Sequence, residues 1–334
     1  NPPTTGYFMD KCIDSAVCGG NPCVNAADGS FRFRCSPFSV ERDSYQLSVS
    51  LSYNSRMTDR ESDLIKGMVR GFRTNYHQFL VQDGRDAGNV DLYKYIDGEG
   101  YVHTFVYNQG LEAYFDKEGR GLMLDADSRS ITDSSNNVLS FDQSGRLISV
   151  RSGLNPSDVK RIEYNSDGLR KVYDERNPDT YIRYSYEFSC LRWIKVFYEG
   201  ELLRTYNLYG FMGQITSIDE SAGNETRTLY QFAYNDRSKV NRFVDCLTKE
   251  AYRLTYAFDS GINDYRFDSL RKGYMEDGHF IQQEGSYFSG MNLSSMAGYG
   301  LLQELIIRDD NDIEKSMMLD TDGALVSTFE RDLG

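Results

Sequence analysis

The stretch IEYNSDGLRKVYDE, residues 162–175, decides the fold class of this chain. Ile162 and Tyr164 alternate with polar neighbours, and the four residues from Asn165 to Gly168 have the composition of a tight turn, with a glycine that can take a left-handed backbone conformation. Alternation of apolar and polar residues resumes at Leu169. The stretch therefore predicts two antiparallel strands joined by a short turn, a β-hairpin.

The hairpin pattern recurs along the chain. In the clearest units an aromatic residue is followed by an acidic or amide residue and, four positions after the aromatic, by glycine. The aromatic positions from 115 to 258 advance in steps of 22 to 26 residues, and the next step, from 258 to 296, is 38. This spacing predicts a repeated unit with an inserted loop or longer hairpin near 268–290. The predicted anchors are Phe115, Gly119, Phe141, Gly145, Tyr164, Gly168, Tyr186, Tyr209, Gly213, Tyr234, Phe258, Gly300 and Gly323.

The length of the unit predicts the architecture. About 23 residues hold two strands of about seven to eight residues and two turns. Nine such units would place about 18 strands side by side, and an open sheet rarely exceeds about ten without curling. We therefore expect an all-β fold in which stacked antiparallel β-hairpins form one long, curved, shell-like sheet. Tyrosines that recur at one position should form a ladder whose hydroxyls tolerate a wet interior, and a recurring position indicates packing rather than a unique active site.

Composition and charge set bounds on partners. The chain is 40% hydrophobic and 13% aromatic, with 25 Tyr and 19 Phe, which favours strands. A formal net charge of −13 disfavours nucleic acid as a partner. No apolar run approaches the roughly 18 residues that a transmembrane helix needs, and no signal segment opens the chain. Because the sequence begins at Asn1 rather than Met, we expect a processed chain or a piece of a longer one.

The cysteines are unevenly distributed. Four of the six lie in the first 35 residues, with neither a C-x-x-C pair nor a neighbouring histidine. This pattern favours disulfides over a zinc site or free thiols, and it indicates an extracytoplasmic location. The other two, Cys190 and Cys246, fall at opposite hairpin edges about 20 Å apart and are expected not to pair. The candidate disulfide cysteines are Cys12, Cys18, Cys23 and Cys35.

The sequence carries no recognised catalytic motif and indicates no cofactor. His77, His103 and His279 are far apart and are expected to be structural. The acidic stretches at 124–133 and 308–314 invite a calcium site, but they lack the glycine and closing glutamate of an EF-hand and are better explained as turn aspartates. We therefore expect no metal site and no enzyme activity, although an acid pair for glycoside hydrolysis could be recognised only in space.

Several stretches resemble the Rhs family, also called tyrosine-aspartate (YD) repeat proteins. FDQSGRLISV at 141–150 and YGFMGQITSI at 209–218 resemble the family repeat. NPCVNAADGSFRF at 21–33, YQLSVSLSYNSR at 45–56 and GFRTNYHQFLV at 71–81 resemble, in the same order, the region that precedes the repeats in bacterial members. The resemblance divides the chain into a cysteine-containing segment at 1–36, a β region at 37–108 and hairpin repeats at 109–334.

The resemblance implies a non-catalytic module of a secreted or cell-surface protein. In bacterial relatives such sheets wind into a shell around a C-terminal toxin or effector, so the implied partner is the remainder of a longer polypeptide. The chain has fewer repeats than a full shell and lacks the usual closing segment, so it resembles an N-terminal piece. A cell-surface adhesion or carbohydrate-binding module is the alternative, and an all-β glycoside hydrolase ranks below both. Exposed sheet edges also favour edge-to-edge self-association.

Overall fold

The computed structural model describes the backbone of residues 23–24, 31–42, 45–55, 65–68, 71–85, 88–117, 119–211, 213–259, 264–289, 294–296, 302–309, 313–319 and 325–332. It describes side chains over 31–35, 47–55, 65–68, 71–85, 88–117, 119–210, 213–258 and 268–283. The described part of the chain is all-β and contains no helix, as the repeat pattern predicts.

The strands divide into two sheets. The N-terminal sheet has the order β1-β2-β3-β4, and the second sheet continues from β5 to β27. The strands are β1 (Cys23–Val24), β2 (Phe31–Arg42), β3 (Tyr45–Asn54), β4 (Phe72–Thr74), β5 (Phe79–Arg85), β6 (Asp91–Ile96), β7 (Val102–Asn108), β8 (Ala113–Asp116), β9 (Met123–Asp125), β10 (Ser130–Thr132), β11 (Val138–Phe141), β12 (Leu147–Arg151), β13 (Val159–Asn165), β14 (Gly168–Asp174), β15 (Asn177–Glu187), β16 (Cys190–Tyr198), β17 (Glu201–Phe211), β18 (Gln214–Ala222), β19 (Glu225–Tyr234), β20 (Val240–Asp245), β21 (Glu250–Asp259), β22 (Asp264–Glu276), β23 (His279–Ser289), β24 (Ser294–Met296), β25 (Leu302–Asp309), β26 (Ile313–Leu319) and β27 (Leu325–Asp332).

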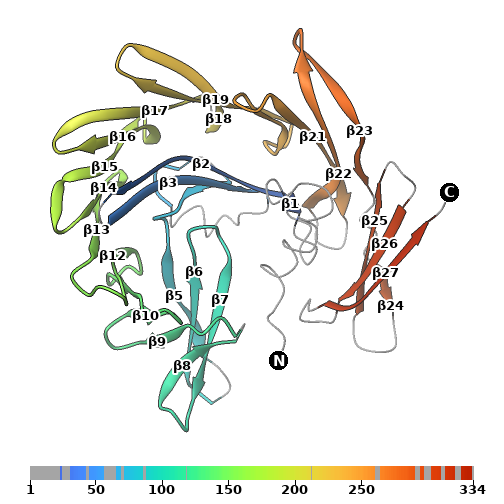
Figure 1. Ribbon diagram of the computed structural model, residues 1–334. Coiled ribbons are helices and arrows are strands. Elements are labelled where there is room, and N and C mark those ends of the chain that lie inside the picture. Colours follow the sequence, from blue (N-terminus) through green and yellow to red (C-terminus); the bar gives the residue numbers. More distant parts are fainter. Residues whose placement is uncertain are drawn as a thin grey trace.

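The second sheet is a curved succession of antiparallel hairpins. Each strand from β11 to β22 pairs with the next one along the chain, and we call these strands the hairpin wall. The wall arches around the N-terminal sheet, and the second sheet as a whole is not closed into a barrel (Figure 1). The stretch 162–175 forms β13, a turn and β14, which is the hairpin that its sequence predicts.

The N-terminal sheet fills the concave side of the wall. Figure 1 shows β2 and β3 inside the arch of β13 to β21. One hydrophobic cluster joins Phe33 and Leu51 of this sheet to Ile218 and Phe243 of the wall. The face of the wall toward β2 and β3 is called the inner face below. The wet interior expected for this part of the sheet is therefore a dry core.

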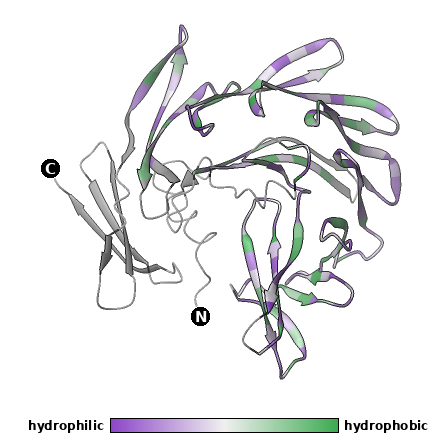
Figure 2. Cartoon of the chain, turned by 180° about the vertical axis from the view of Figure 1, so that it is seen from behind, coloured by the Kyte–Doolittle hydropathy of each residue, from purple (hydrophilic) through white to green (hydrophobic). Residues whose placement is uncertain are grey.

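Alternation of side chains explains which face each strand buries. In β16, Ile194 and Val196 are buried whereas the residues between and beside them are half-buried, and Figure 2 shows the same alternation of hydropathy along the wall. Strand β3 is different because it lies inside the arch. Its serine face is also covered, with Ser50 and Ser52 only 2% and 5% exposed.

The first strands of the second sheet curl back toward the wall. An isolated bridge joins Phe79 of β5 to Arg146, just before β12. The amide of Leu80 donates to the carbonyl of Gly145 at 2.8 Å, and the amide of Leu147 donates to the carbonyl of Gln78 at 3.1 Å. The break between the two sheets, at residues 75–78, therefore lies beside the first repeat of the wall.

The interval that interrupts the repeat spacing carries β22 and β23. These strands form a long hairpin whose turn contains Asp277 and Gly278. The hairpin extends well beyond the neighbouring turns of the wall (Figure 1).

Candidate functional site

A β-bulge recurs in every hairpin of the wall. The register shifts by one residue next to one position of each unit, and in every unit except that of β21 and β22 the residue at that position faces the residue that follows the turn. Because a bulge leaves one residue of the longer strand unpaired, it fixes the phase of the hairpin. We call this place the ladder position. It is occupied by Phe141, Tyr164, Tyr186, Gly210, Tyr234 and Tyr256.

The ladder tyrosines donate hydrogen bonds from one unit to the unit before it. Tyr186 donates to the carbonyl of Leu169 at 2.8 Å, and Tyr234 donates to Ile215 at 2.7 Å. Tyr256 donates in the same way to Val240, also at 2.8 Å. Each accepting carbonyl belongs to the residue beside the bulge of the preceding unit. Burial raises the pKa of Tyr186 and Tyr234 above the usual value, so their hydroxyls stay protonated and remain donors.

Two predicted anchors do not occupy the ladder position. Tyr209 and Phe258 are 50% and 55% exposed, and the ladder places of their units belong to Gly210 and Tyr256. The prediction counted four residues from aromatic to glycine. In the unit of Tyr209, however, Gly213 lies only three residues after the ladder position, and the turn after Tyr256 is longer. A Cβ atom at Gly210 would lie 1.8 Å from the carbonyl oxygen of Gln214, which excludes a ring there.

The other anchors are turn and packing residues where they are described. Phe115 is half-buried in β8 and pairs with Val106. Positive φ angles occur at Gly119, Gly145, Gly168 and Gly213, and at Gly145 a Cβ atom would also meet the Leu80 carbonyl at 2.1 Å. The predicted anchors Gly300 and Gly323 lie outside the described residues.

The N-terminal region accepts hydrogen bonds from two backbone amides on the inner face of the wall. Each amide lies just after the turn of a hairpin, and one other hairpin separates the two. The amide of Leu191 donates to the carbonyl of Gly67 at 2.6 Å, and the amide of Val240 donates to the hydroxyl of Tyr53 at 3.0 Å. Gly67 lies against the ladder itself, because its Cβ atom would be 2.3 Å from the ring of Tyr186. No motif marks Gly67, and sequence reasoning missed it.

Removing one ladder hydroxyl tests the inter-unit hydrogen bonds. We expect Tyr186→Phe to lower the free energy of unfolding by about 1 kcal/mol, because the Leu169 carbonyl loses its donor. Tyr164→Phe is the matched control, since the buried Tyr164 hydroxyl has no partner in the described part of the chain. Urea unfolding followed by circular dichroism compares the two variants. Equal losses from both would show that the hydroxyl contributes nothing through this bond.

The segment GFRTNYHQF, residues 71–79, forms a buried polar cluster where the two sheets meet. The side chain of Asn75 accepts the amide proton of Ser50 at 3.2 Å. Gln78 donates to the carbonyl of Asn75 at 2.8 Å and accepts the hydroxyl of Tyr95 at 2.6 Å. The polar residues of this segment therefore connect β3, β4 and β6, which is a structural role.

Two of the three histidines are buried in the same region. His103 contacts Asp97, with Nε2 and Oδ2 3.1 Å apart, and its ring stacks on Tyr95. His77 is 1% exposed, and its Nδ1 accepts the Thr74 amide at 3.2 Å. Burial, with a contribution from the charge of Arg73, lowers the pKa of His77 to about 3. His279, by contrast, is exposed at the start of β23, next to the turn of the β22–β23 hairpin.

The buried histidine should make stability depend on pH. Because the pKa of His77 is about 3 in the folded chain and about 6.5 in the unfolded chain, only the unfolded chain takes up this proton between those values. Stability is therefore lost as the pH falls below about 6.5, by about 2 kcal/mol between pH 7 and pH 5. His77→Gln should remove that part of the loss. Urea unfolding at both pH values measures it, and an unchanged loss in His77→Gln would contradict the assignment.

Glu220 is a buried acid that bears on the hydrolase alternative. It is 4% exposed and accepts hydrogen bonds from Arg227 at 2.7 Å and from the hydroxyl of Tyr206 at 3.2 Å, and it also pairs with Arg204. Burial raises the pKa of Glu220, but the two arginines outweigh burial and lower it. Glu220 is thus ionised, which is unsuited to a general acid.

The described cysteines are free thiols. Cys35 points into the core from β2 and donates to the carbonyl of Leu51 at 3.5 Å, so the predicted disulfide set does not include it. Burial raises the pKa of its thiol to about 12. Cys190 and Cys246 are also free. The side chains of the other three candidates, Cys12, Cys18 and Cys23, lie outside the described residues.

The acidic stretch at 124–133 is used in turns. Asp125 accepts the amide protons of Asp127 and Ser128, and Asp133 accepts those of Ser135 and Asn137. Among the side chains that the structure describes, no three His, Cys, Asp or Glu are grouped to hold a metal ion. The side chains of the second acidic stretch, 308–314, lie outside the described residues. The described part of the chain also contains no helix with the length and apolar character to span a membrane.

Comparisons with known proteins return weak likenesses. No protein-family model and no curated protein matches the chain. Among solved structures, a Tc holotoxin pore from Photorhabdus luminescens aligns over 93% of this chain and 20% of its own, with 10% identity and a TM-score of 0.29. A porin-like protein from Bacteroides uniformis aligns over 77% of this chain and 94% of its own, with 8% identity and a TM-score of 0.26. Both TM-scores lie below 0.5, so neither likeness assigns a function. The chain spans about a fifth of the length of the Photorhabdus chain.

Proposed function

We propose that this chain is a non-catalytic structural module of a secreted or cell-surface protein of the Rhs, or YD-repeat, type. In this role it forms part of a β-shell that encloses or presents the remainder of a longer polypeptide. The observation that carries the proposal is the hairpin wall, whose units are joined by ladder tyrosines and whose inner face is held by the N-terminal sheet. A recurring position of this kind supports packing rather than catalysis.

The residues with unusual environments support a structural role. The buried histidines and Glu220 are engaged by neighbouring groups, and the ladder hydroxyls of Tyr186, Tyr234 and Tyr256 donate to backbone carbonyls. The rings at the ladder position face the N-terminal sheet rather than an open groove, which counts against carbohydrate binding on the inner face. The repeats resemble the YD pattern at 141–150 and 209–218 in sequence, and both stretches lie in hairpins.

Proteolysis of the longer natural gene product tests enclosure. If this chain is part of a shell, trypsin should cleave the polypeptide that follows residue 334 slowly while the wall is intact. Phe33→Ala, which weakens the core between the wall and the N-terminal sheet, should expose that polypeptide and speed its cleavage. Mass spectrometry locates the cut sites. Equally fast cleavage of the downstream polypeptide in the native protein and in Phe33→Ala would refute enclosure.

A further inference from the structure

Three arginines stand side by side on the outer face of the wall. Arg242 of β20 is the direct cross-strand partner of Arg253 of β21, and Arg253 is the partner of Arg271 of β22. Phe243 and Tyr252, the strand neighbours of the first two, are buried on the inner face, so these arginines point outward. Like charges at directly opposed positions destabilise a sheet, so strand pairing alone does not explain this row.

Two of these arginines have no acidic partner in the described part of the chain. Some arginines elsewhere in the wall are paired, as Arg161 is with Glu175 at 3.1 Å, whereas Arg151, Arg170 and Arg183 form no side-chain ion pair with a described residue. The side chains of Arg242 and Arg253 form no hydrogen bond and no ion pair with any described residue. Their charges are thus available to an anion from outside the described chain.

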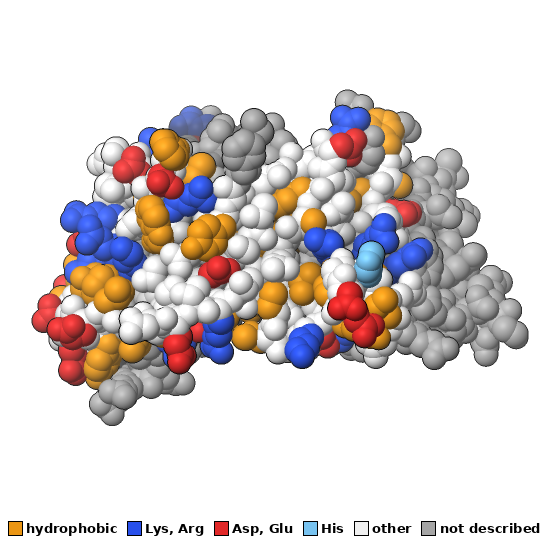
Figure 3. Space-filling view, turned by 90° about the horizontal axis from the view of Figure 1, so that it is seen from above, with side chains coloured by type: hydrophobic (Ala, Val, Ile, Leu, Met, Phe, Trp, Pro, Cys, Tyr) orange, Lys and Arg blue, Asp and Glu red, His pale blue; other side chains and the backbone are white. Residues whose placement is uncertain are grey.

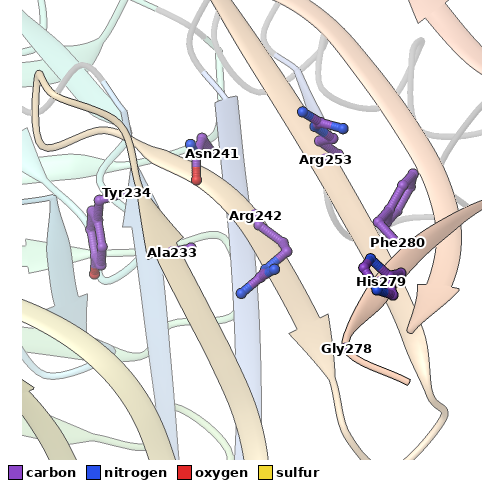
Figure 4. A pocket seen from close by; sticks show the side chains of 8 residues that line it. All are labelled: Ala233, Tyr234, Asn241, Arg242, Arg253, Gly278, His279 and Phe280. Atoms are coloured by element: carbon purple, nitrogen blue, oxygen red, sulfur yellow. The ribbon is translucent and has the colours of Figure 1, made fainter. Parts of the chain in front are cut away.

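The two guanidinium groups line a pocket with a volume of about 370 Å³ (Figure 4). The turn of the β22–β23 hairpin contributes to one side of it, and β19 and β20 contribute to the other. Figure 3 shows a histidine with Lys and Arg side chains on one side of it and a group of Asp and Glu side chains on the other. The lining side chains that matter here are Arg242, Arg253, His279 and Phe280.

We propose that this pocket binds a small oxyanion, a carboxylate or phosphate group, carried by a ligand with an apolar part. Guanidinium groups bind both anions through paired N–H donors, and Arg242 and Arg253 stand at directly opposed positions of adjacent strands. His279 adds a further donor, and the ring of Phe280 offers an apolar surface beside it (Figure 4). The net charge of −13 repels a long polyanion more strongly than an anion with one or two charges, so a small ligand is the better fit. This site does not depend on the proposed shell.

Calorimetric titration with two probes, benzoate and inorganic phosphate, tests the proposal at constant ionic strength. We expect the whole chain to bind at least one probe, and the probe that binds identifies the group as carboxylate or phosphate. The double variant Arg242→Gln, Arg253→Gln should bind that probe about a hundredfold more weakly, about tenfold for each guanidinium removed. The matched control is Arg161→Gln, Arg237→Gln, which removes the same charge from exposed side chains and should retain the native affinity.

Two further measurements separate loss of the site from loss of the fold. Without anion, the double variant at 242 and 253 should melt at the same temperature as the native chain or higher, because a repulsive pair is gone. Arg242→Lys keeps the charge but loses the planar fork, and it should weaken binding about tenfold. The proposal is overturned if neither probe binds the native chain, or if the control pair weakens binding as much as the pocket pair.

Discussion

Replacing Phe33 by alanine is expected to lower the free energy of unfolding by about 3–5 kcal/mol. Phe33 is 2% exposed, and its ring stacks on Phe243 of the wall with centroids 4.6 Å apart and on Phe232 at 5.3 Å. It also stacks on Tyr53 within the N-terminal sheet. Truncation would leave a cavity bounded by rings from both sheets, which cannot collapse without moving one sheet against the other.

Chemical unfolding followed by near-ultraviolet circular dichroism measures this loss. Phe188→Ala is the matched control, because Phe188 lies in a hairpin turn and is 91% exposed, and it should change the free energy of unfolding by less than about 0.5 kcal/mol. Phe33→Leu should lose less than the alanine variant because it leaves a smaller cavity. If Phe33→Ala and Phe188→Ala lose the same free energy, the N-terminal sheet is not packed against the wall.

The hairpins of the wall could be predicted because their signals are local. In IEYNSDGLRKVYDE the alternation and the turn residues all lie within one unit, and Tyr164 and Gly168 stand where the pattern places them. The ladder position of β17 was missed because Gly213 lies three residues after it instead of four, and the place of the bulge is visible only in the register, where Gly210 pairs with Ile215. Phe258 was chosen over Tyr256 for the same reason.

The filling of the concave side could not be predicted because its contacts are distant in sequence. Lys239 donates to the carbonyl of Ser55, which lies 184 residues earlier, and Val240 donates to Tyr53 across 187 residues. The sequence of β3 shows that one face is apolar, but it does not show that its serine face is also covered. The arginine pocket was missed on similar grounds, since Arg242 and Arg253 become neighbours only through strand register.

Replacing Gly67 by alanine is expected to lower the free energy of unfolding by about 3 kcal/mol. The φ angle of Gly67 is +74°, which costs an L-residue about 1–2 kcal/mol. The added methyl group would also lie 2.3 Å from Cε1 of Tyr186 and 2.8 Å from the carbonyl oxygen of Asp167, and such overpacking adds about 1–3 kcal/mol. The carbonyl of Gly67 accepts the Leu191 amide, so a shift of this segment would also break a bond to the wall.

Gly200→Ala separates the two causes of this loss. Gly200 has a φ angle of +83° and no atom within 4 Å of its Cβ site, so its variant bears the backbone cost alone. The difference between the two alanine variants in thermal and urea unfolding therefore measures how tightly Gly67 is seated on the ladder. Adding Tyr186→Leu to Gly67→Ala should recover part of that difference, because the ring that blocks the methyl group is gone. Equal losses for Gly67→Ala and Gly200→Ala would mean that the N-terminal segment does not press on Tyr186, and the attachment of that segment to the inner face would then have to rest on the other contacts.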